Sequence, residues 1–389
     1  MPGSAARPRD DVADVIGRVS EAVFRRVGAE SQRNAMLRRI VDNPPPRVRV
    51  RDPFQSFGRH GRRSRAVRRR PSGFNMRALI FPGQGSQAVG MARDLAEAFP
   101  QAKAVLDEVD AALGQHLSRL MFEGPVEALT LTTNAQPALM AASLAVLRVL
   151  EAERGLDLAR DVACVAGHSL GEYAALAAAG SLTVTDAAKL LRLRGEAMQE
   201  AVAPGAGAMA ALIGTDLDAA RAVAEAAAQE AGGGAVCDVA NDNGGGQVVL
   251  SGDRPAVERA VGIATGRGIK RAVMLNVSAP FHCRLMAPAA EAMARALAAV
   301  TLTAPRVALY ANVAAAPVSD PEGIRTALVE QVTGTVRWRE SVAAMAASGV
   351  DRFHELGAGK VLTGLVKRIA PQASANAIGT PADVAAFAL

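Results

Sequence analysis

Short apolar runs alternate with longer stretches of helical spacing along most of the chain. Met76–Phe81 and Val162–Ala166 predict buried strands, each followed by a turn that contains glycine. Strands that alternate with helices are typical of an α/β fold built on a mainly parallel sheet. The helical stretches of this first part lie at about 92–113, 137–153, 170–179 and 185–201.

A segment in the middle of the chain, at about 205–276, has a different order of elements. Its apolar and helical stretches follow one another as strand, helix, strand, strand, helix and strand, which is the order of a ferredoxin-like module. Beyond it the simple alternation returns, so residues 205–276 are expected to be inserted in a larger α/β subdomain made of residues 76–204 and 277–389. The strands are expected at Met209–Ile213, Val236–Ala240, Gln247–Ser251, Lys270–Leu275, Val307–Asn312 and Arg352–Glu355, and the inserted helices at 216–231 and 255–267.

Composition supports a buried core and limits the classes of partner. Of the 389 residues, 50% are hydrophobic and only 3% are aromatic, which disfavours a surface that stacks nucleic-acid bases. The net charge of +6 divides unevenly, because residues 1–75 hold 18 Arg, no Lys and 7 acidic residues, a net of +11. Residues 76–389 therefore have a net charge of −5, and we expect neither nucleic acid nor membrane as a partner.

The basic segment 1–75 is expected to be a disordered extension. Pro44–Pro46 interrupt it, and the arginine-rich run Arg62–Arg70 is typical of a solvated charged segment. A tether to an anionic surface and upstream sequence ahead of a natural start at Met76 both remain open. The 7 acidic residues disfavour a transit peptide.

The cysteines and the longest uncharged stretch predict a cytoplasmic protein. Cys164, Cys237 and Cys283 are odd in number and lack disulfide or metal-ligand spacing, so we expect a reducing compartment and no metal. The stretch Ala128–Leu147 has no charge, but it contains Thr, Asn and Gln side chains and a proline. It is therefore a poor membrane span.

The strongest chemical signal is Gly167–Gly171, which has the pattern Gly-x-Ser-x-Gly between a predicted strand and a predicted helix. This is the setting of a nucleophile elbow, in which a tight turn exposes the Ser oxygen and the glycines avoid clashes. We therefore predict that Ser169 is a nucleophile and that the larger subdomain is α/β-hydrolase-like. Free N–H groups at the following helix start, such as that of Leu170, can stabilise an oxyanion.

A nucleophilic Ser needs a base, and the chain has five His residues. His60 lies in the extension, and His116 lies in a stretch without polar company. His168 neighbours the Ser and should point away from it, whereas His354 lies in an apolar strand. His282 lies in a proline-containing loop after a strand, where catalytic groups tend to occur, and is the best candidate by elimination.

Two further features bear on the choice between a hydrolase and a transferase. Arg192 and Arg194 lie on the helix after the elbow helix, and neighbours two apart cannot share a helix face, so that one can reach inward. A buried Arg near the nucleophile suggests a substrate with its own carboxylate. A hydrolase would need an acid between Ser and His, and no Asp there has a distinctive setting, so both classes remain open. Asp186, Asp238, Asp242 and Asp253 are the Asp residues of that interval considered for this role.

Several motifs together match one family. From Met76 to the C-terminus the chain resembles malonyl-CoA:acyl-carrier-protein transacylases and the similar acyltransferase domains of polyketide synthases. Any one motif could arise by chance, whereas all of them in this order are highly specific. The matching stretches are Phe81–Gln87, Asn134–Leu139, Gly167–Tyr173, Arg194–Gly195, Ala279–His282 and Gly357–Leu362.

The resemblance implies a ping-pong transfer of malonyl from malonyl-CoA to the phosphopantetheine thiol of an acyl carrier protein. The intermediate would be an ester on Ser169, with His282 as the base. The backbone N–H groups of Gln84 and Leu170 would form the oxyanion hole, and Arg194 would bind the malonyl carboxylate. Such enzymes orient the His largely through backbone carbonyls, which accounts for the missing acid.

Four other residues receive roles from the same resemblance. Asn241 and Asn243 match a loop near the catalytic His, and Phe281 should favour malonyl over methylmalonyl by crowding an α-methyl group. Arg337 stands where many relatives have a Gln that helps to hold this His, and we expect the longer side chain to orient it.

The family further implies a monomer with no permanently bound cofactor that supplies fatty-acid synthesis. A polyketide pathway and a serine hydrolase or thioesterase remain as alternatives.

Overall fold

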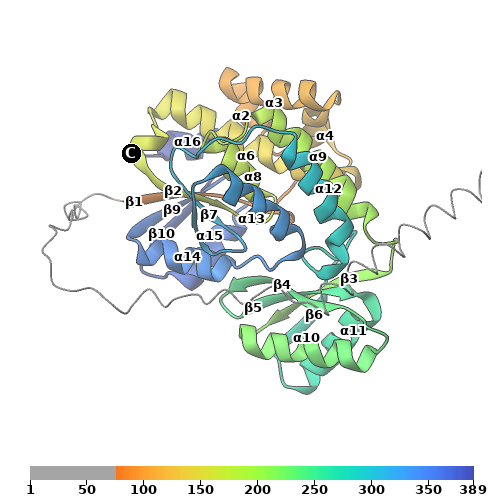
Figure 1. Cartoon of the computed structure of the whole chain (residues 1–389). Coiled ribbons are helices and arrows are strands. Elements are labelled where there is room, and N and C mark those ends of the chain that lie inside the picture. The colour runs from red at the N-terminus through yellow and green to blue at the C-terminus, as the bar shows by residue number, and fades with distance from the viewer. Residues whose placement is uncertain (1–75) are drawn as a thin grey trace, which may run out of the picture. The chain divides into compact units, whose positions relative to one another are not determined.

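The larger of two sheets has six strands in the order β10-β9-β1-β2-β7-β8, in a computed structural model that describes residues 76–389 (Figure 1). Every neighbouring pair is parallel except β7 and β8, so the predicted α/β fold with a mainly parallel sheet is confirmed. The predictions for residues 1–75 lie outside the described residues. The strands are β1 (Met76–Phe81), β2 (Val162–Gly167), β7 (Ala308–Ala311), β8 (Ala316–Val318), β9 (Val350–Leu356) and β10 (Ser374–Ile378).

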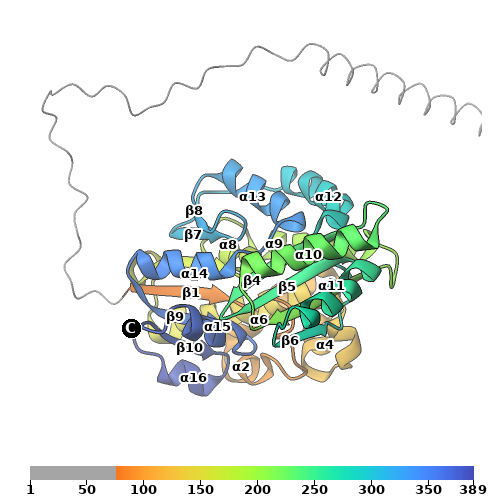
Figure 2. The same cartoon turned by 90° about the horizontal axis from the view of Figure 1, so that it is seen from below.

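Helices cover both faces of this sheet because β1 carries apolar side chains on both of its faces (Figures 1 and 2). Leu79 and Phe81 pack in one core cluster with α6 and α8, whereas Ala78 and Ile80 pack in a second cluster with α14 and α15. Central parallel strands read as continuous apolar runs for this reason. The helices of this part are α2 (Arg93–Ala98), α3 (Pro100–Leu113), α4 (Leu117–Glu123), α5 (Val126–Thr130), α6 (Thr132–Arg154), α7 (Leu158–Asp161), α8 (Gly171–Ala178), α9 (Val184–Glu200), η1 (Arg284–Met286), α12 (Ala287–Ala298), α13 (Pro321–Thr333), α14 (Trp338–Ala347), α15 (Val361–Ile369) and α16 (Pro381–Ala386).

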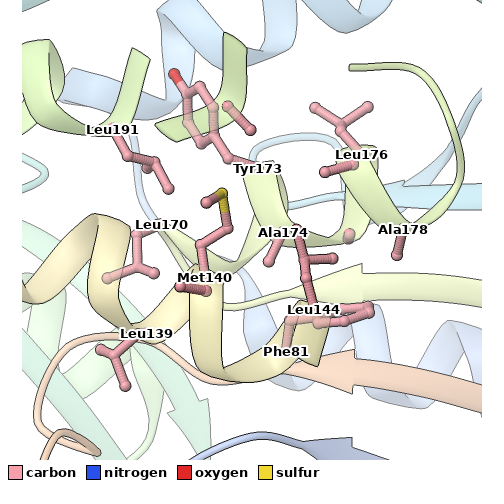
Figure 3. Close-up of a cluster of buried hydrophobic side chains, with 14 of the residues drawn as sticks. Phe81, Leu139, Met140, Leu144, Leu170, Tyr173, Ala174, Leu176, Ala178 and Leu191 are labelled. Carbon is pink, nitrogen blue, oxygen red and sulfur yellow. The ribbon is translucent and has the colours of Figure 1, made fainter. Parts of the chain in front are cut away.

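The helix α6 runs through the centre of the larger core cluster, where Figure 3 shows Met140 and Leu144 among side chains of α8 and β1. It is the one helix of the described residues that is long and apolar enough to cross a membrane, by length and composition alone. However, 83% of its most apolar stretch is buried inside the protein, as expected of a core helix. It begins at Thr132, five residues before the predicted start, and Pro137 lies inside it.

The structure also divides one predicted helix in two and contains two strands that the sequence pattern does not predict. The stretch 92–113 is two helices, because Phe99 is extended (φ −134°) before Pro100. The edge strands β8 and β10 were not predicted, because the first has three residues and the second alternates between exposed and partly buried positions over most of its length.

The smaller sheet is antiparallel throughout, in the order β4-β5-β3-β6. Its outer face packs on α10 and α11 (Figures 1 and 2), and its inner face presents Met209 and Val249 to a cavity shared with the larger part. The strand β4 continues to Gly244, past the predicted end at Ala240, so Asn241 and Asn243 lie in a strand and the expected loop is wrong. In chain order the elements are β3 (Gly207–Ile213), α10 (Leu217–Ala231), β4 (Cys237–Gly244), β5 (Gln247–Asp253), α11 (Arg254–Gly266) and β6 (Arg271–Met274).

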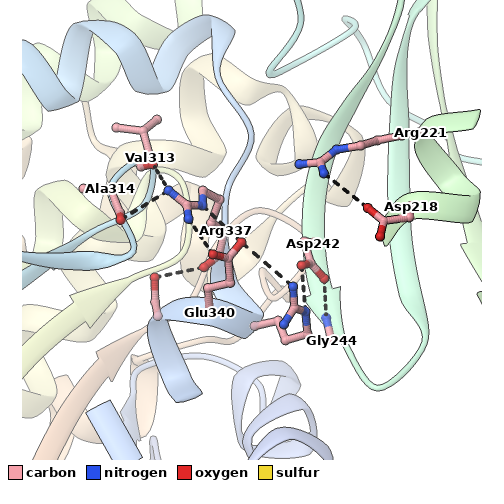
Figure 4. A network of polar contacts seen from close by, with 10 residues as sticks. Asp218, Arg221, Asp242, Gly244, Val313, Ala314, Arg337 and Glu340 are labelled. Atoms are coloured by element: carbon pink, nitrogen blue, oxygen red, sulfur yellow. Dashed lines mark hydrogen bonds and ion pairs between the residues drawn. The ribbon is translucent and has the colours of Figure 1, made fainter. Parts of the chain in front are cut away.

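The end of β4 is fastened to the segment before α14. The N–H of Asp242 donates to the carbonyl of Val336, whose own N–H donates to Ala240. The Asp242 carboxylate, which is almost fully buried, accepts from Arg339 Nε at 2.8 Å (Figure 4). These contacts fix the inner face of the small sheet against the larger part.

The glycine at the start of α8 allows the close packing of this helix on β1 to be tested by substitution. A Cβ on Gly171 would lie 2.3 Å from the carbonyl oxygen of Phe81, so Gly171→Ala should destabilise the protein by about 3 kcal/mol or more. Gly364, inside α15, meets nothing within 4 Å, and Gly364→Ala should instead stabilise it by up to about 1 kcal/mol. Urea unfolding of both variants measures the difference; equal free energies of unfolding would contradict the packing described.

Candidate active site

Ser169 lies on the tight turn between β2 and α8, with a left-handed backbone (φ +53°) that few non-glycine residues adopt. The flanking glycines are required by space. A Cβ on Gly167 would lie 1.9 Å from the backbone of Gly171. The strand–turn–helix geometry is that of the predicted elbow, although α8 begins at Gly171 and Leu170 is its N-cap residue.

His282 lies opposite the elbow, between β6 and η1, and is also left-handed (φ +59°). Its Nε2 is 2.7 Å from Ser169 Oγ, and its Nδ1 is 2.8 Å from the carbonyl oxygen of Gln331. A carbonyl can only accept, so Nδ1 carries the proton and Nε2 is free to accept the Ser169 hydroxyl proton. The ring is buried, with 3% of the residue exposed.

No carboxylate orients this imidazole within the described residues. Of the four Asp residues considered, Asp238 accepts from the backbone and guanidinium of Arg284, two residues after His282, and Asp242 binds Arg339. Asp186 accepts from Thr183, and Asp253 from the backbone of Val236.

Of the two arginines, Arg194 reaches inward and Arg192 remains half-buried against polar side chains at the surface. Arg194 is 1% exposed. Its Nη1 donates to Gln136 Oε1 at 2.7 Å, and its Nη2 donates to Gln331 Oε1 at 2.8 Å and to Ser169 Oγ at 3.2 Å. The charge is therefore held by neutral amide oxygens, and no carboxylate of the described chain bonds it.

Gln331, Glu172 and Asn312 form a buried polar group under the elbow that the sequence analysis missed. The side chain of Gln331 donates to the carbonyl of Ser169 at 3.0 Å and to Glu172 Oε2 at 2.9 Å. Asn312 Oδ1 accepts from the backbone N–H of Ser169 at 2.8 Å. Glu172 in the mostly apolar helix α8 and Asn312 after the apolar strand β7 were the available signals, because single polar residues in apolar runs are exceptions. Gln331 stands among other polar residues of α13 and gives no such signal.

Burial sets the protonation states in this region. Desolvation, and next the charge of Arg194, lowers the pKa of His282 to about 3, so that the imidazole is neutral near pH 7. Desolvation raises the pKa of Glu172 to about 7, against the opposing effect of its hydrogen bonds. One of its oxygens accepts two N–H groups and the other has no hydrogen-bond partner among residues 76–389, which suits a carboxyl that is partly protonated at neutral pH.

A cavity of about 360 Å³ opens beside Ser169 and is lined by the other predicted residues except Arg337. Within residues 76–389 no acceptor is hydrogen-bonded to the backbone N–H of Gln84 or of Leu170, so both are free to bind an oxyanion. Phe281 lies next to His282 in the wall. Asn243 Oδ1 pairs with His168 Nε2 at 2.9 Å, not with His282, and Asn241 lines the cavity beside it.

The expected role of Arg337 is wrong. Figure 4 shows its guanidinium directed to the carbonyls of Val313 and Ala314 and to the carboxylate of Glu340. His282 is held by Gln331 instead, because that helix, α13, faces the elbow.

Comparison with known proteins places this geometry in a family. Residues 78–382 match the model of the acyl transferase domain. The malonyl CoA-acyl carrier protein transacylase of Escherichia coli K12 is 47% identical over 309 residues, which cover 79% of this chain and 97% of that protein. An acyl-carrier-protein S-malonyltransferase from Bartonella henselae is 55% identical, with a TM-score of 0.77, over 80% of this chain and 98% of that one.

A second solved structure contains a partner. It is a malonyl-transacylase in complex with its type II PKS acyl-carrier protein, 42% identical with a TM-score of 0.76, covering 80% of this chain and 98% of that one. The matches extend over nearly the whole length of these relatives and over the same part of this chain that carries the elbow, the base and the buried Arg. The chain therefore belongs to the acyl transferase domain family, among the malonyl-CoA–acyl carrier protein transacylases.

Proposed function

We propose that this protein transfers a malonyl group from coenzyme A to the phosphopantetheine thiol of an acyl carrier protein, through an ester on Ser169. The observation that carries the proposal is the 2.7 Å contact between Ser169 Oγ and His282 Nε2, with the buried guanidinium of Arg194 on the same oxygen. A nucleophile, its base and a cation for a carboxylated acyl group thus meet in one cavity.

In the first half-reaction, Ser169 Oγ attacks the thioester carbonyl while its proton passes to His282 Nε2. The carbonyl oxygen becomes an oxyanion that the free N–H groups of Gln84 and Leu170 stabilise. The carbon–sulfur bond then breaks, and the leaving thiolate takes the proton back from His282. The products are malonyl-Ser169 and coenzyme A.

In the second half-reaction, the thiol of the carrier protein gives its proton to His282 and attacks the ester carbonyl. The bond to Ser169 Oγ breaks, and the imidazolium returns the proton to that oxygen. A relative solved together with its acyl-carrier protein supports such a partner for this chain.

Selectivity would come from Arg194 and Phe281. A hydrogen bond to a charged group is worth about 1.5–3 kcal/mol, so neutral acyl groups, which cannot form an ion pair with Arg194, should be disfavoured by about that amount. One methyl group in an apolar pocket is worth only about 1–3 kcal/mol, so discrimination against methylmalonyl by Phe281 should be weaker.

We extend the proposal to the architecture and setting of the enzyme. Residues 76–204 and 277–389 would form an α/β-hydrolase-like subdomain, and residues 205–276 an inserted ferredoxin-like one, which the strand order of the small sheet supports. We further propose that the enzyme is a cytoplasmic monomer that supplies fatty-acid synthesis. The relatives named malonyl CoA-acyl carrier protein transacylases support the pathway, and a relative named as a polyketide biosynthesis protein supports the alternative.

Intact mass after incubation with malonyl-CoA should increase by one malonyl group in the native protein. Ser169→Ala should abolish the increase, because the nucleophilic oxygen is lost. Ser181→Ala, which removes a buried hydroxyl outside the cavity, is the control and should label normally. An unlabelled native protein would overturn the proposed function.

Replacement of the buried Arg separates a malonyltransferase from a hydrolase of neutral esters. Arg194→Ala should reduce acylation by malonyl-CoA by roughly 10- to 200-fold more than acylation by acetyl-CoA, since only the first substrate has a carboxylate. Loss of the bond to Ser169 Oγ should affect both substrates. Arg192→Ala, two residues away on the same helix, should keep the native preference. Equal losses for both acyl groups in Arg194→Ala would refute its assigned role.

The pH dependence of acylation should lack the loss typical of a catalytic His. Because the pKa of His282 is lowered to about 3, the neutral base persists as pH falls from 8 to 5, and kcat/KM should not decrease through 6.5. Malonyl-N-acetylcysteamine thioester is the suitable substrate because it carries no titrating phosphate. Any inflection near pH 7 should disappear in Glu172→Gln.

The contrary result is a tenfold decrease in kcat/KM per pH unit below 6.5 in both proteins, with circular dichroism showing that they remain folded. That result would mean that the imidazole is not desolvated as the structure indicates.

A further inference from the structure

A continuous chain of side-chain hydrogen bonds joins Arg194 to the loop that carries Gln84. Arg194 Nη1 donates to Gln136 Oε1 at 2.7 Å, and Gln136 Nε2 donates to Thr132 Oγ1 at 2.9 Å. The Thr132 hydroxyl then donates to Gln84 Oε1 at 2.9 Å. The chain thus begins at the cation for the acyl carboxylate and ends on the residue whose backbone N–H faces the nascent oxyanion.

The guanidinium of Arg194 can only donate, and the Thr132 hydroxyl supplies the acceptor that the Gln136 NH₂ group needs when the Gln136 oxygen faces that charge. This hydroxyl has one proton, which goes to Gln84, so it can only accept from Gln136. That acceptance places the NH₂ group of Gln136 toward Thr132 and its oxygen toward Arg194. Without the hydroxyl, the amide could rotate and set its N–H groups against the guanidinium.

The position of Thr132 is fixed by burial and by helix packing. It is the first residue of α6, and none of its surface is exposed. The helix α9 packs closely against it at Gly195. A Cβ at that position would lie 2.9 Å from the Thr132 carbonyl oxygen and 2.7 Å from Thr133 Cα, so only glycine fits there. Gly195 follows Arg194, so the close approach of the two helices fixes the Arg and the Thr relative to each other.

Gln84, in contrast to the buried Thr132, is exposed on the loop after β1. Within residues 76–389 its side chain has no hydrogen-bond partner other than Thr132. The buried hydroxyl is therefore the point where a rigid helix terminus holds an exposed loop.

We propose that Thr132 is a positioning residue that couples recognition of the acyl carboxylate at Arg194 to the geometry of the oxyanion loop at Gln84. This inference rests on the proposed function. Thr132 touches no reacting atom; it orients Gln136, and through it the guanidinium, on one side and holds the Gln84 loop on the other. Gln331 still holds Arg194 from the other side, so loss of Thr132 should weaken the site without abolishing it.

The test compares three single variants by quenched-flow and intact-mass measurement of acylation by malonyl-CoA and by acetyl-CoA. Thr132→Val keeps the shape and removes the hydroxyl, whereas Thr132→Ser keeps the hydroxyl and removes the methyl group. Thr133→Val is the control, since that neighbouring hydroxyl makes no side-chain hydrogen bond within the described residues.

Thr132→Val should lower kcat/KM for malonyl-CoA about 10- to 100-fold and for acetyl-CoA by a smaller factor, because only malonyl uses Arg194. Thr132→Ser and Thr133→Val should stay within about threefold of the native protein. In an Arg194→Ala background the extra loss with malonyl-CoA should vanish, which a double-mutant cycle measures.

Three outcomes would overturn the inference. They are a Thr132→Val activity within threefold of native, equal losses for the two acyl groups, and a Thr132→Ser variant as impaired as Thr132→Val. If Thr132→Val does not fold, Gln136→Met breaks the same chain one step nearer Arg194 and should show the same unequal loss. Absence of acylation in the native protein itself would instead count against the proposed function.

Discussion

The buried charge of Arg194, to which no carboxylate of residues 76–389 is hydrogen-bonded, is the constraint around which this site is built. An isolated charge in a protein interior costs several kcal/mol unless polar groups surround it. Here the surrounding groups are amide oxygens of Gln136 and Gln331 and, at 5.8 Å from the guanidinium, the ring of Tyr173. Each amide can present its oxygen only if its NH₂ group has another acceptor. This one charge therefore determines which groups donate and which accept in the hydrogen bonds that extend from Arg194 to the elbow and to the start of α6.

The hydrogen-bond network around Arg194 also stabilises two strained backbone positions. Ser169 and His282 are both left-handed, a conformation that costs of order 1–3 kcal/mol for such residues, and they face each other across 2.7 Å. Asn312 and Gln331 hold the backbone of Ser169, and the carbonyl of Gln331 holds the imidazole. Gln331 of α13 thus contacts Ser169, His282 and Arg194, so the imidazole is oriented without a carboxylate among residues 76–389.

Two predictions for side chains near His282 were wrong for a common physical reason. Arg337 was expected to orient that His and instead binds Glu340, and Asn243 was expected in a loop and instead lies in a strand and binds His168. In each case the backbone was in the right neighbourhood, but the direction of the side chain was set by pairing that sequence spacing does not encode. The bulged strand β4 turns Asn243 toward the elbow, and the ion pair of the buried Asp242 carboxylate with the partly exposed Arg339 fixes that strand.

Local patterns determined most of the elements of this protein, because runs such as Met76–Phe81 and the spacing of Gly167–Gly171 carry backbone constraints within a few residues. Family motifs further pointed to Ser169, His282 and Arg194. Only the tertiary structure decided which groups hold them, since Thr132, Glu172, Asn312 and Gln331 come from four separate elements or loops and meet only when the chain has folded. Hydrogen-bond direction among buried amides depends on every partner at once, and that information exists only after the chain has folded.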